Sequence, residues 1–216
     1  MIKIEHVDVS GFEAAIRGMR NPMDSWEQGD SFYDYDWAKF VVGPKDRDLM
    51  VKLAKGGGSH AKFRRMINVT IDITAPLYWW KEFDTYKVGT VANSCSTMHR
   101  IHAKELTVGD FSHEHLVDSS YGLLLQIIDA LNEFREQYLN FSEPTEQFNC
   151  NKDVWWQMIQ LLPSSYNQRR TVQLNYEVLA AIYRDRHNHK LDEWVYFCSW
   201  IETLPYSEVI TLKNVK

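Results

Sequence analysis

The feature that most constrains the fold is an unbroken alternation over residues 66–73, MINVTIDI. Polar or flexible side chains at the even positions alternate with four β-branched residues: Ile67, Val69, Ile71 and Ile73. Successive side chains of a strand point to opposite faces, so a period of two places all four apolar side chains on one face. The segment therefore predicts a β-strand with one buried and one polar face.

Most other periodic segments favour helices. Apolar residues recur at helical spacing, and several segments have start or stop signals, such as Gly56–Gly58, Pro76 and Gly89. The expected helices cover residues 11–20, 45–55, 77–88, 121–140, 151–162, 167–187 and 191–203. A second strand is expected over 1–9, and 21–40 is expected to be loop plus a helical turn. The sequence thus predicts an α+β fold in one domain over 1–216, with a small sheet from the first half and a helical second half.

Composition narrows the class of protein. The chain has 216 residues, of which 44% are apolar, so it can bury a sizeable core. Its net charge of −5 argues against a general nucleic-acid-binding surface. No apolar run is long enough to span a membrane, and the N-terminal segment MIKIEHVDVS lacks the pattern of a signal peptide. Cys95, Cys150 and Cys198 lack metal-ligand spacing, which favours reduced thiols in a cytoplasmic protein.

Three groups of side chains could carry chemistry, and each has a simpler interpretation. Cys95 near His99 could form a nucleophilic pair, or be a loop thiol. The spacings His99-x-x-His102 and His113-x-His115 could ligate a metal, but solvated loop histidines are more common, and no metal site is predicted. The aromatic runs Tyr78–Trp80 and Trp155-Trp156 could stack on a base, but fit a core or a subunit interface better.

Two long segments carry a resemblance to a known family. Residues 58–97 contain, in order, Gly58-Ser59-His60, the strand, Ala75-Pro76, an aromatic helix and a loop rich in Ser and Thr. Further on, Leu161-Leu162-Pro163 precedes Asn175 by twelve residues, and Arg186 follows. This order and spacing resemble the flavin-dependent thymidylate synthase (ThyX) family.

The resemblance implies a ThyX-like fold with a small mixed or antiparallel sheet, assembled as a homo-oligomer, namely a tetramer. It also implies FAD as the cofactor and dUMP as the substrate, which the family methylates with a folate-derived methylene and a flavin hydride. By position, the residues implied in nucleotide binding are Glu82, Lys87, Ser94, Cys95, Ser96, Thr97 and Arg100. Those implied in flavin binding are His60, Thr85, Tyr86, Asn175 and Arg186.

The chain departs from the family at its Arg-His-Arg signature, which falls on Thr85-Tyr86-Lys87. The family's serine falls on Cys95, or on Ser94 if the alignment slips by one residue. Three further family arginines fall on Thr97, Ile159 and Glu177. Arginine offers phosphate a planar set of donors that lysine cannot reproduce, so these changes alter the implied anion clamp.

Three hypotheses follow. In the first, the chain is a ThyX-like protein with an altered active site that binds or acts on a pyrimidine nucleotide such as dUMP. In the second, it is a non-catalytic protein that sequesters nucleotides and has lost FAD. In the third, it is an active FAD-dependent thymidylate synthase with a relocated clamp.

Overall fold

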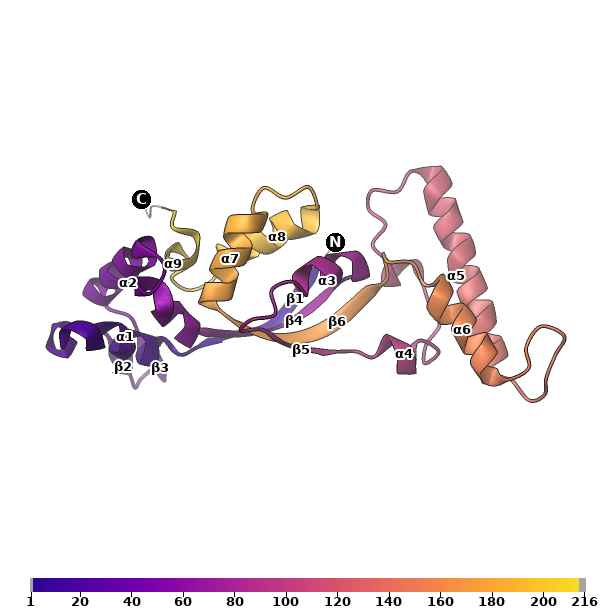
Figure 1. Ribbon diagram of the computed structural model, residues 1–216, viewed down its shortest axis with the longest axis horizontal. Helices are drawn as coiled ribbons and strands as arrows, with labels where there is room; N and C mark the ends of the chain where they lie inside the picture. Colours follow the sequence, from indigo (N-terminus) through magenta and orange to yellow (C-terminus); the bar gives the residue numbers. More distant parts are fainter. Residues whose placement is uncertain (1, 214–216) are drawn as a thin grey trace. The chain divides into compact units, whose positions relative to one another are not determined.

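The computed structural model describes residues 2–213 (Figure 1). A four-stranded sheet has the order β1-β4-β6-β5, and β2 pairs with β3 in a separate antiparallel hairpin. The strands are β1 (Lys3–Ser10), β2 (Phe32–Asp34), β3 (Lys39–Val41), β4 (Asn68–Pro76), β5 (Val91–Ser94) and β6 (Asn167–Asn175). The helices are α1 (Phe12–Arg20), α2 (Pro44–Gly56), α3 (Leu77–Phe83), α4 (Thr97–Arg100), α5 (Asp118–Leu139), α6 (Asn151–Leu161), α7 (Tyr176–Arg186), α8 (Asp192–Ile201) and α9 (Glu208–Thr211).

The central strand confirms the alternation found in the sequence. In β4 the side chains of Val69, Ile71 and Ile73 are fully buried, and Ile67 is buried just before the strand begins. The polar residues between them are only partly buried. The α+β class is also confirmed, and among residues 2–213 no helix combines the length and apolar character needed to cross a membrane.

The chain divides into two compact units. The first contains the first residues of the chain, Ile73–Asp84 and Asn93–Arg170. The second contains Ile4–Asp72, Thr85–Ala92 and the chain from Thr171 onward. A single domain over 1–216 stays a prediction.

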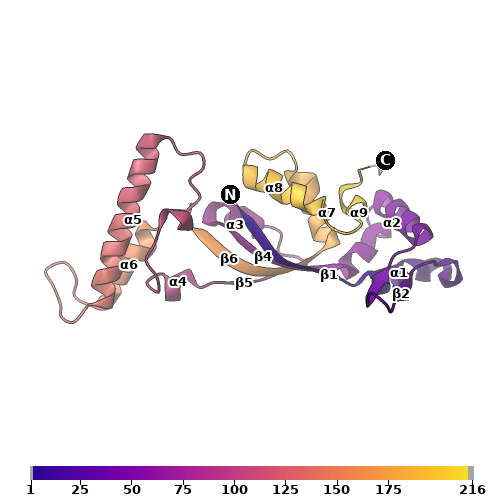
Figure 2. The same cartoon turned by 180° about the vertical axis from the view of Figure 1, so that it is seen from behind.

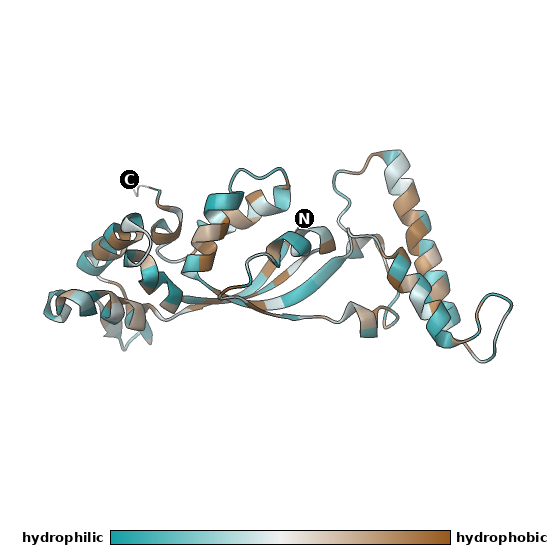
Figure 3. Cartoon of the chain, in the orientation of Figure 1, coloured by the Kyte–Doolittle hydropathy of each residue, from teal (hydrophilic) through white to brown (hydrophobic). Residues whose placement is uncertain are grey.

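The core of the first unit lies between α5 and α6, which lie side by side in Figures 1 and 2. Figure 3 shows the apolar residues of α5 along its length. Leu124, Ile128 and Leu131 of α5 are buried together with Met158 of α6. Leu124, Ile128 and Leu131 recur at helical spacing within the helix expected over 121–140, so the helical periodicity located this side of the core correctly.

The expected helix over 167–187 is wrong in its first half. Residues 167–175 form β6, whose Val172 and Leu174 are buried while Gln173 between them is exposed. The helix α7 begins only after Asn175, whose side chain accepts hydrogen bonds from the backbone N–H groups of Glu177 and Val178, both at 3.1 Å. Such a cap marks the first turn of a helix, so the sheet also takes a strand from the second half of the chain.

Two further expectations need correction. The helix expected over 77–88 is shorter than predicted. It ends at Phe83, so Thr85 and Tyr86 lie outside it. The segment 21–40, expected to be loop plus a helical turn, contains two short 3-10 turns and strand β2, which pairs with β3. The stop at Gly56–Gly58 is confirmed, since α2 ends at Gly56 and both Gly57 and Gly58 have positive φ angles.

Candidate functional site

In the first unit, the loop that follows β5 is held by Gln168 of β6. The side-chain amide nitrogen of Gln168 donates to the backbone oxygen of Cys95 (3.0 Å) and to Oγ1 of Thr97 (3.1 Å). The backbone N–H of Cys95 donates to the oxygen of Arg169 at 2.9 Å. One glutamine thus fixes both ends of the segment Cys95–Thr97.

Gln168 is itself fixed by an arginine that stacks on a buried tryptophan. Arg170 Nε donates to Gln168 Oε1 (3.0 Å), and Arg170 Nη1 pairs with Asp84 Oδ1 (2.7 Å). The guanidinium carbon lies 4.2 Å from the centre of the Trp80 ring, and Trp80 Nε1 donates to the Gln168 backbone oxygen at 2.9 Å. The cation–π contact and the ion pair together fix the orientation of the Arg170 guanidinium group.

The loop presents hydroxyl and thiol groups to solvent. Ser94, Cys95, Ser96 and Arg100 are exposed, and Thr97 is partly buried. Ser96 Oγ accepts from the backbone N–H of His99 and so caps α4. Because Ser96 and Thr97 use their oxygens as acceptors within the loop, their O–H groups remain suited to donate to an acceptor such as a phosphate or a base carbonyl.

Glu82, the remaining first-unit residue with an implied nucleotide role, is partly buried on α3. The aromatic residues beside it belong to the core: Trp79, Trp80 and Phe83 are buried and contact one another. The structure therefore rejects base stacking for Trp79 and Trp80 and confirms the core interpretation.

A cavity of about 340 Å³ lies next to the loop, within the first unit. Its lining combines two imidazoles, a cation and two aromatic rings from Met98, His99, His102, Tyr138, Asn151, Lys152 and Trp155. The indole of Trp155 donates to the backbone oxygen of Met98 at 2.9 Å, which fixes that wall. Among residues 2–213 no group of side chains has the composition of a metal site. The sequence singled out His99 and His102, but it could not show that α5 and α6 complete a cavity with them.

The three thiols differ sharply in environment. Cys95 and Cys150 are exposed, whereas Cys198 is buried on α8, and burial raises its pKa to about 12. We expect a thiol reagent such as 5,5′-dithiobis(2-nitrobenzoate) to titrate two thiols quickly in the native protein at pH 8, and the third only after unfolding. A Cys198→Ala variant that still titrates two fast thiols is the control; three fast thiols in the native protein would contradict the assignment.

In the second unit, Tyr86 and Arg186 are neighbours in a group of aromatic and polar side chains. Arg186 Nε donates to the Tyr86 hydroxyl at 3.0 Å, and Arg186 Nη1 lies 2.9 Å from His189 Nε2. The Arg186 guanidinium carbon lies 5.0 Å from the centre of the Trp194 ring, which is fully buried. Two residues predicted from sequence are thus brought together, and His189 and Trp194 are contacts that sequence reasoning missed.

Asn175 has a structural role at the start of α7, because its Oδ1 caps that helix. Its other terminal atom, Nδ2, faces Gly89, where an added Cβ would lie only 3.0 Å away. Gly89 has a φ angle of 83°, which an L-residue rarely adopts. Space and backbone conformation both require glycine here.

The glutamate that replaces a family arginine has a partner within its own unit. Arg64 Nε donates to Glu177 Oε2 at 2.7 Å, and Arg64 Nη1 donates to the backbone oxygen of Val209 at 3.1 Å. Arg64 is buried, so Glu177 satisfies a buried cation. Glu177 is therefore held by an ion pair within its own unit.

The remaining residues predicted from sequence are exposed. Thr85 and Lys87 lie on the surface of the second unit. The ring of His60 lies close to Gly56, where an added Cβ would be 3.5 Å from it. His60 lines a cavity formed by α1, α2 and the 3-10 helix η3 (His60–Met66).

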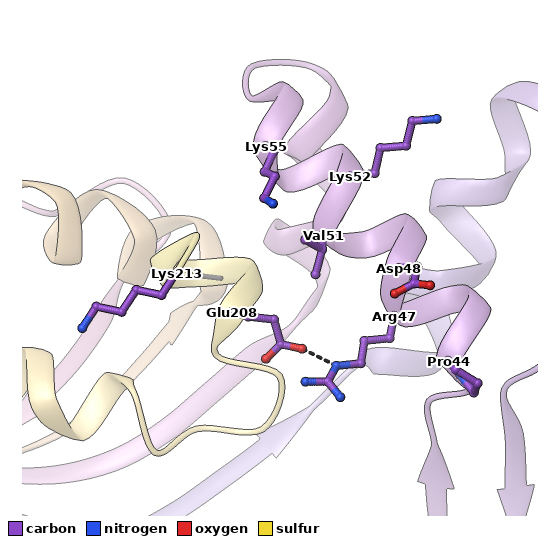
Figure 4. Close-up of a pocket in the computed structure, with 8 residues that line it drawn as sticks. All are labelled: Pro44, Arg47, Asp48, Val51, Lys52, Lys55, Glu208 and Lys213. Carbon is purple, nitrogen blue, oxygen red and sulfur yellow. Dashed lines mark hydrogen bonds and ion pairs between the residues drawn. The ribbon is translucent and has the colours of Figure 1, made fainter. Parts of the chain in front are cut away.

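Figure 4 shows another cavity of the second unit, of about 610 Å³, beside α2 and α9. Arg47 pairs with Glu208 there, and Lys213 Nζ binds Glu202 Oε1 at 2.6 Å. None of the residues predicted from sequence lines it. Two of its cationic side chains, Arg47 and Lys213, are already held by carboxylates. We assign this cavity no nucleotide.

The fold is that of known nucleotide enzymes. No family model matches the chain, and no curated protein does either. The flavin-dependent thymidylate synthase ThyX from Helicobacter pylori, solved with FAD and dUMP, matches with 14% identity and a TM-score of 0.65, over 98% of this chain and 97% of that one. The UMP/dUMP methylase PolB from Streptomyces cacaoi, bound with 5-Br dUMP, matches with 15% identity and a TM-score of 0.61, over 98% and 95%. The ThyX-like fold expected from the sequence is confirmed.

Proposed function

From this fold, we infer that the chain binds a pyrimidine nucleotide such as dUMP through the loop after β5. The observation that carries the inference is the match along nearly the whole chain to enzymes solved with dUMP, 5-Br dUMP or 5-Br UMP. The loop supports it, because Ser94, Ser96 and Thr97 supply hydroxyl donors and Arg100 supplies a cation at the end of α4.

Three more side chains of the first unit support this loop site. Glu82 stands where the resemblance implies a contact with the base, and the Cys95 side chain faces solvent between two serines. Lys87, which the resemblance also implies in nucleotide binding, is an exposed cation of the second unit. Arg170 acts indirectly, because its ion pair with Asp84 and its contact with Gln168 hold the loop in place.

The residues of the second unit fit a flavin in part. Arg186 and Asn175 Nδ2 are donors suited to acceptor atoms, and Tyr86 and Trp194 add aromatic surface. Thr85 and His60, which the sequence resemblance also implies in flavin binding, are exposed polar residues of the same unit. A bound flavin would supply hydride chemistry, and this chain's residues would bind and orient it. The chain would then act as a homotetramer, the assembly that the sequence resemblance implies.

The test is a paired measurement of flavin and nucleotide. Protein purified from cells is examined for the absorbance of FAD, and dUMP is then titrated by calorimetry with and without added FAD. Saturable dUMP binding supports the proposal, and bound FAD extends it to an enzyme of the ThyX type. Binding of dUMP without any affinity for FAD selects the sequestering protein, and no response to a panel of pyrimidine nucleotides overturns the proposal.

Gln168 offers a sharper test of the loop. We expect Gln168→Ala to weaken dUMP binding by about thirtyfold, because two hydrogen bonds to the loop are lost and each contributes roughly 1 kcal/mol. Gln168→Glu should weaken dUMP binding to the same extent, since a carboxylate cannot donate a hydrogen bond to the Cys95 backbone oxygen. Calorimetric titration of each variant measures the effect.

Gln173→Ala is the matched control, because Gln173 is an exposed glutamine on the same strand. It should bind dUMP as the wild type does. Wild-type affinity in Gln168→Ala would show that the loop does not depend on this residue.

A further inference from the structure

The cavity that His60 lines differs in character from the candidate nucleotide site. It lies wholly in the second unit and has a volume of about 670 Å³, within the range of small-molecule sites. Segments from α1 to η3 surround it, and their side chains supply an apolar part and a charged part to its lining.

The apolar part of this lining is almost entirely aliphatic. Met19 and Phe63 are buried, and Leu49 and Leu53 of α2 are partly buried. Methionine side chains adapt to the shape of a ligand, and Met19, Met23 and Met66 all contribute. Phe63 is the only Phe, Tyr or Trp in the lining, so the cavity lacks the paired flat rings that clamp a planar heterocycle. The walls suit a flexible aliphatic chain.

The charged part of the lining has one sign. Lys62 and Arg65 contribute cations, His60 adds an imidazole, and no carboxylate lines the cavity. Lys62, Arg65 and His60 are exposed, whereas Met19 and Phe63 are buried. In a chain with a net charge of −5, cations without a lining carboxylate favour an anionic head group.

We propose that this cavity binds an organic anion that has an aliphatic body and a single acidic head group, of the class of medium-chain carboxylates. The body lies against Met19, Leu53 and Phe63, and the head group pairs with Arg65 and Lys62. A guanidinium can hold a carboxylate through two parallel hydrogen bonds, so we expect Arg65 to contribute more to the binding free energy than Lys62. This site goes beyond the proposed nucleotide function, because its ligand contacts lie outside the loop after β5.

Decanoate is the probe, and decan-1-ol is its uncharged counterpart. Displacement of the fluorescent anion 8-anilinonaphthalene-1-sulfonate and calorimetry should both show saturable binding of decanoate. We expect Lys62→Gln/Arg65→Gln to weaken decanoate at least tenfold, roughly the loss of one charge-assisted contact, while decan-1-ol binds as before. Both replaced residues are exposed, so the double variant should fold.

Lys52→Gln is the control, because Lys52 is an exposed lysine on α2 outside this cavity. It should bind decanoate like the wild type, and dUMP binding should not change in the double variant. The proposal is overturned by unsaturable decanoate binding, by equal affinity in the double variant, or by full displacement of decanoate by FAD, which would make the cavity part of a flavin site. A failure of dUMP binding alone leaves these outcomes unaffected and counts only against the nucleotide proposal.

Discussion

Replacement of Asp46 by alanine is expected to lower the free energy of unfolding by about 3–5 kcal/mol, the range for removing one partner of a buried ion pair. Asp46 and Arg20 are both buried, and Arg20 Nε donates to Asp46 Oδ1 at 2.6 Å. Asp46 Oδ2 also accepts from the backbone N–H groups of Asp30 and Ser31, both at 3.0 Å, and from the Ser31 hydroxyl at 2.7 Å. The variant would strand a buried guanidinium and three donors at once.

Urea denaturation of wild type and Asp46→Ala measures this loss. Asp48→Ala is the matched control, because Asp48 is an exposed aspartate on the same helix, and its effect should stay within about 0.5 kcal/mol. A loss below about 1 kcal/mol in Asp46→Ala would show that the pair is not a main support of the second unit.

The Asp46 carboxylate should also make the stability of the protein depend on pH. Burial raises the pKa of Asp46, but hydrogen bonds from Ser31, Arg20 and the backbone outweigh it, so the pKa lies below its ordinary value of 3.8. A lowered folded-state pKa contributes stability that is fully present above the unfolded value and is lost as the pH falls towards the folded value. The difference in stability between wild type and Asp46→Asn should therefore be constant near neutral pH and shrink below about pH 4.

Replacement of Trp80 by alanine is expected to cost about 3–5 kcal/mol, the range for removing a large aromatic side chain from a core. Trp80 is buried, contacts Trp79 and Phe83, and carries the Arg170 guanidinium on its ring. Its indole N–H also bonds to the backbone of Gln168. We therefore expect the nucleotide affinity to fall together with stability, because the support of Gln168 and Arg170 is lost.

Thermal and urea unfolding measure the first effect, and dUMP titration measures the second. Trp80→Phe keeps an aromatic face for Arg170 and should retain much of the stability and of the dUMP affinity. Trp156→Ala removes an exposed tryptophan and should change neither quantity much. If Trp80→Ala lost stability but bound dUMP normally, the stacked arginine would have no part in holding the loop.

Only part of the candidate site could be predicted from the sequence. The sequence predicted a loop rich in Ser and Thr before residue 97; Ser94, Cys95 and Ser96 are exposed, and the short helix α4 begins at Thr97. Gln168 and its contact with Cys95 and Thr97 were missed, because residues 167–175 were assigned to a helix. The signal was present in the alternation of Val172 and Leu174 and in the capping side chain of Asn175. With that strand assigned, the pairing of β6 with β5 brings Gln168 to the loop.

The sequence by itself determined the elements whose periodicity is strong. The alternation in β4 and the apolar stripe of α5 each follow from local geometry, because a strand or helix repeats its facing direction at a fixed interval. Only the tertiary structure decided which charges are neutralised and which residues meet. Glu177 with Arg64, Arg170 with Trp80, and Arg186 with Tyr86 are partners 90 to 113 residues apart in the sequence. No periodicity encodes such pairs, since they depend on how strands and helices pack.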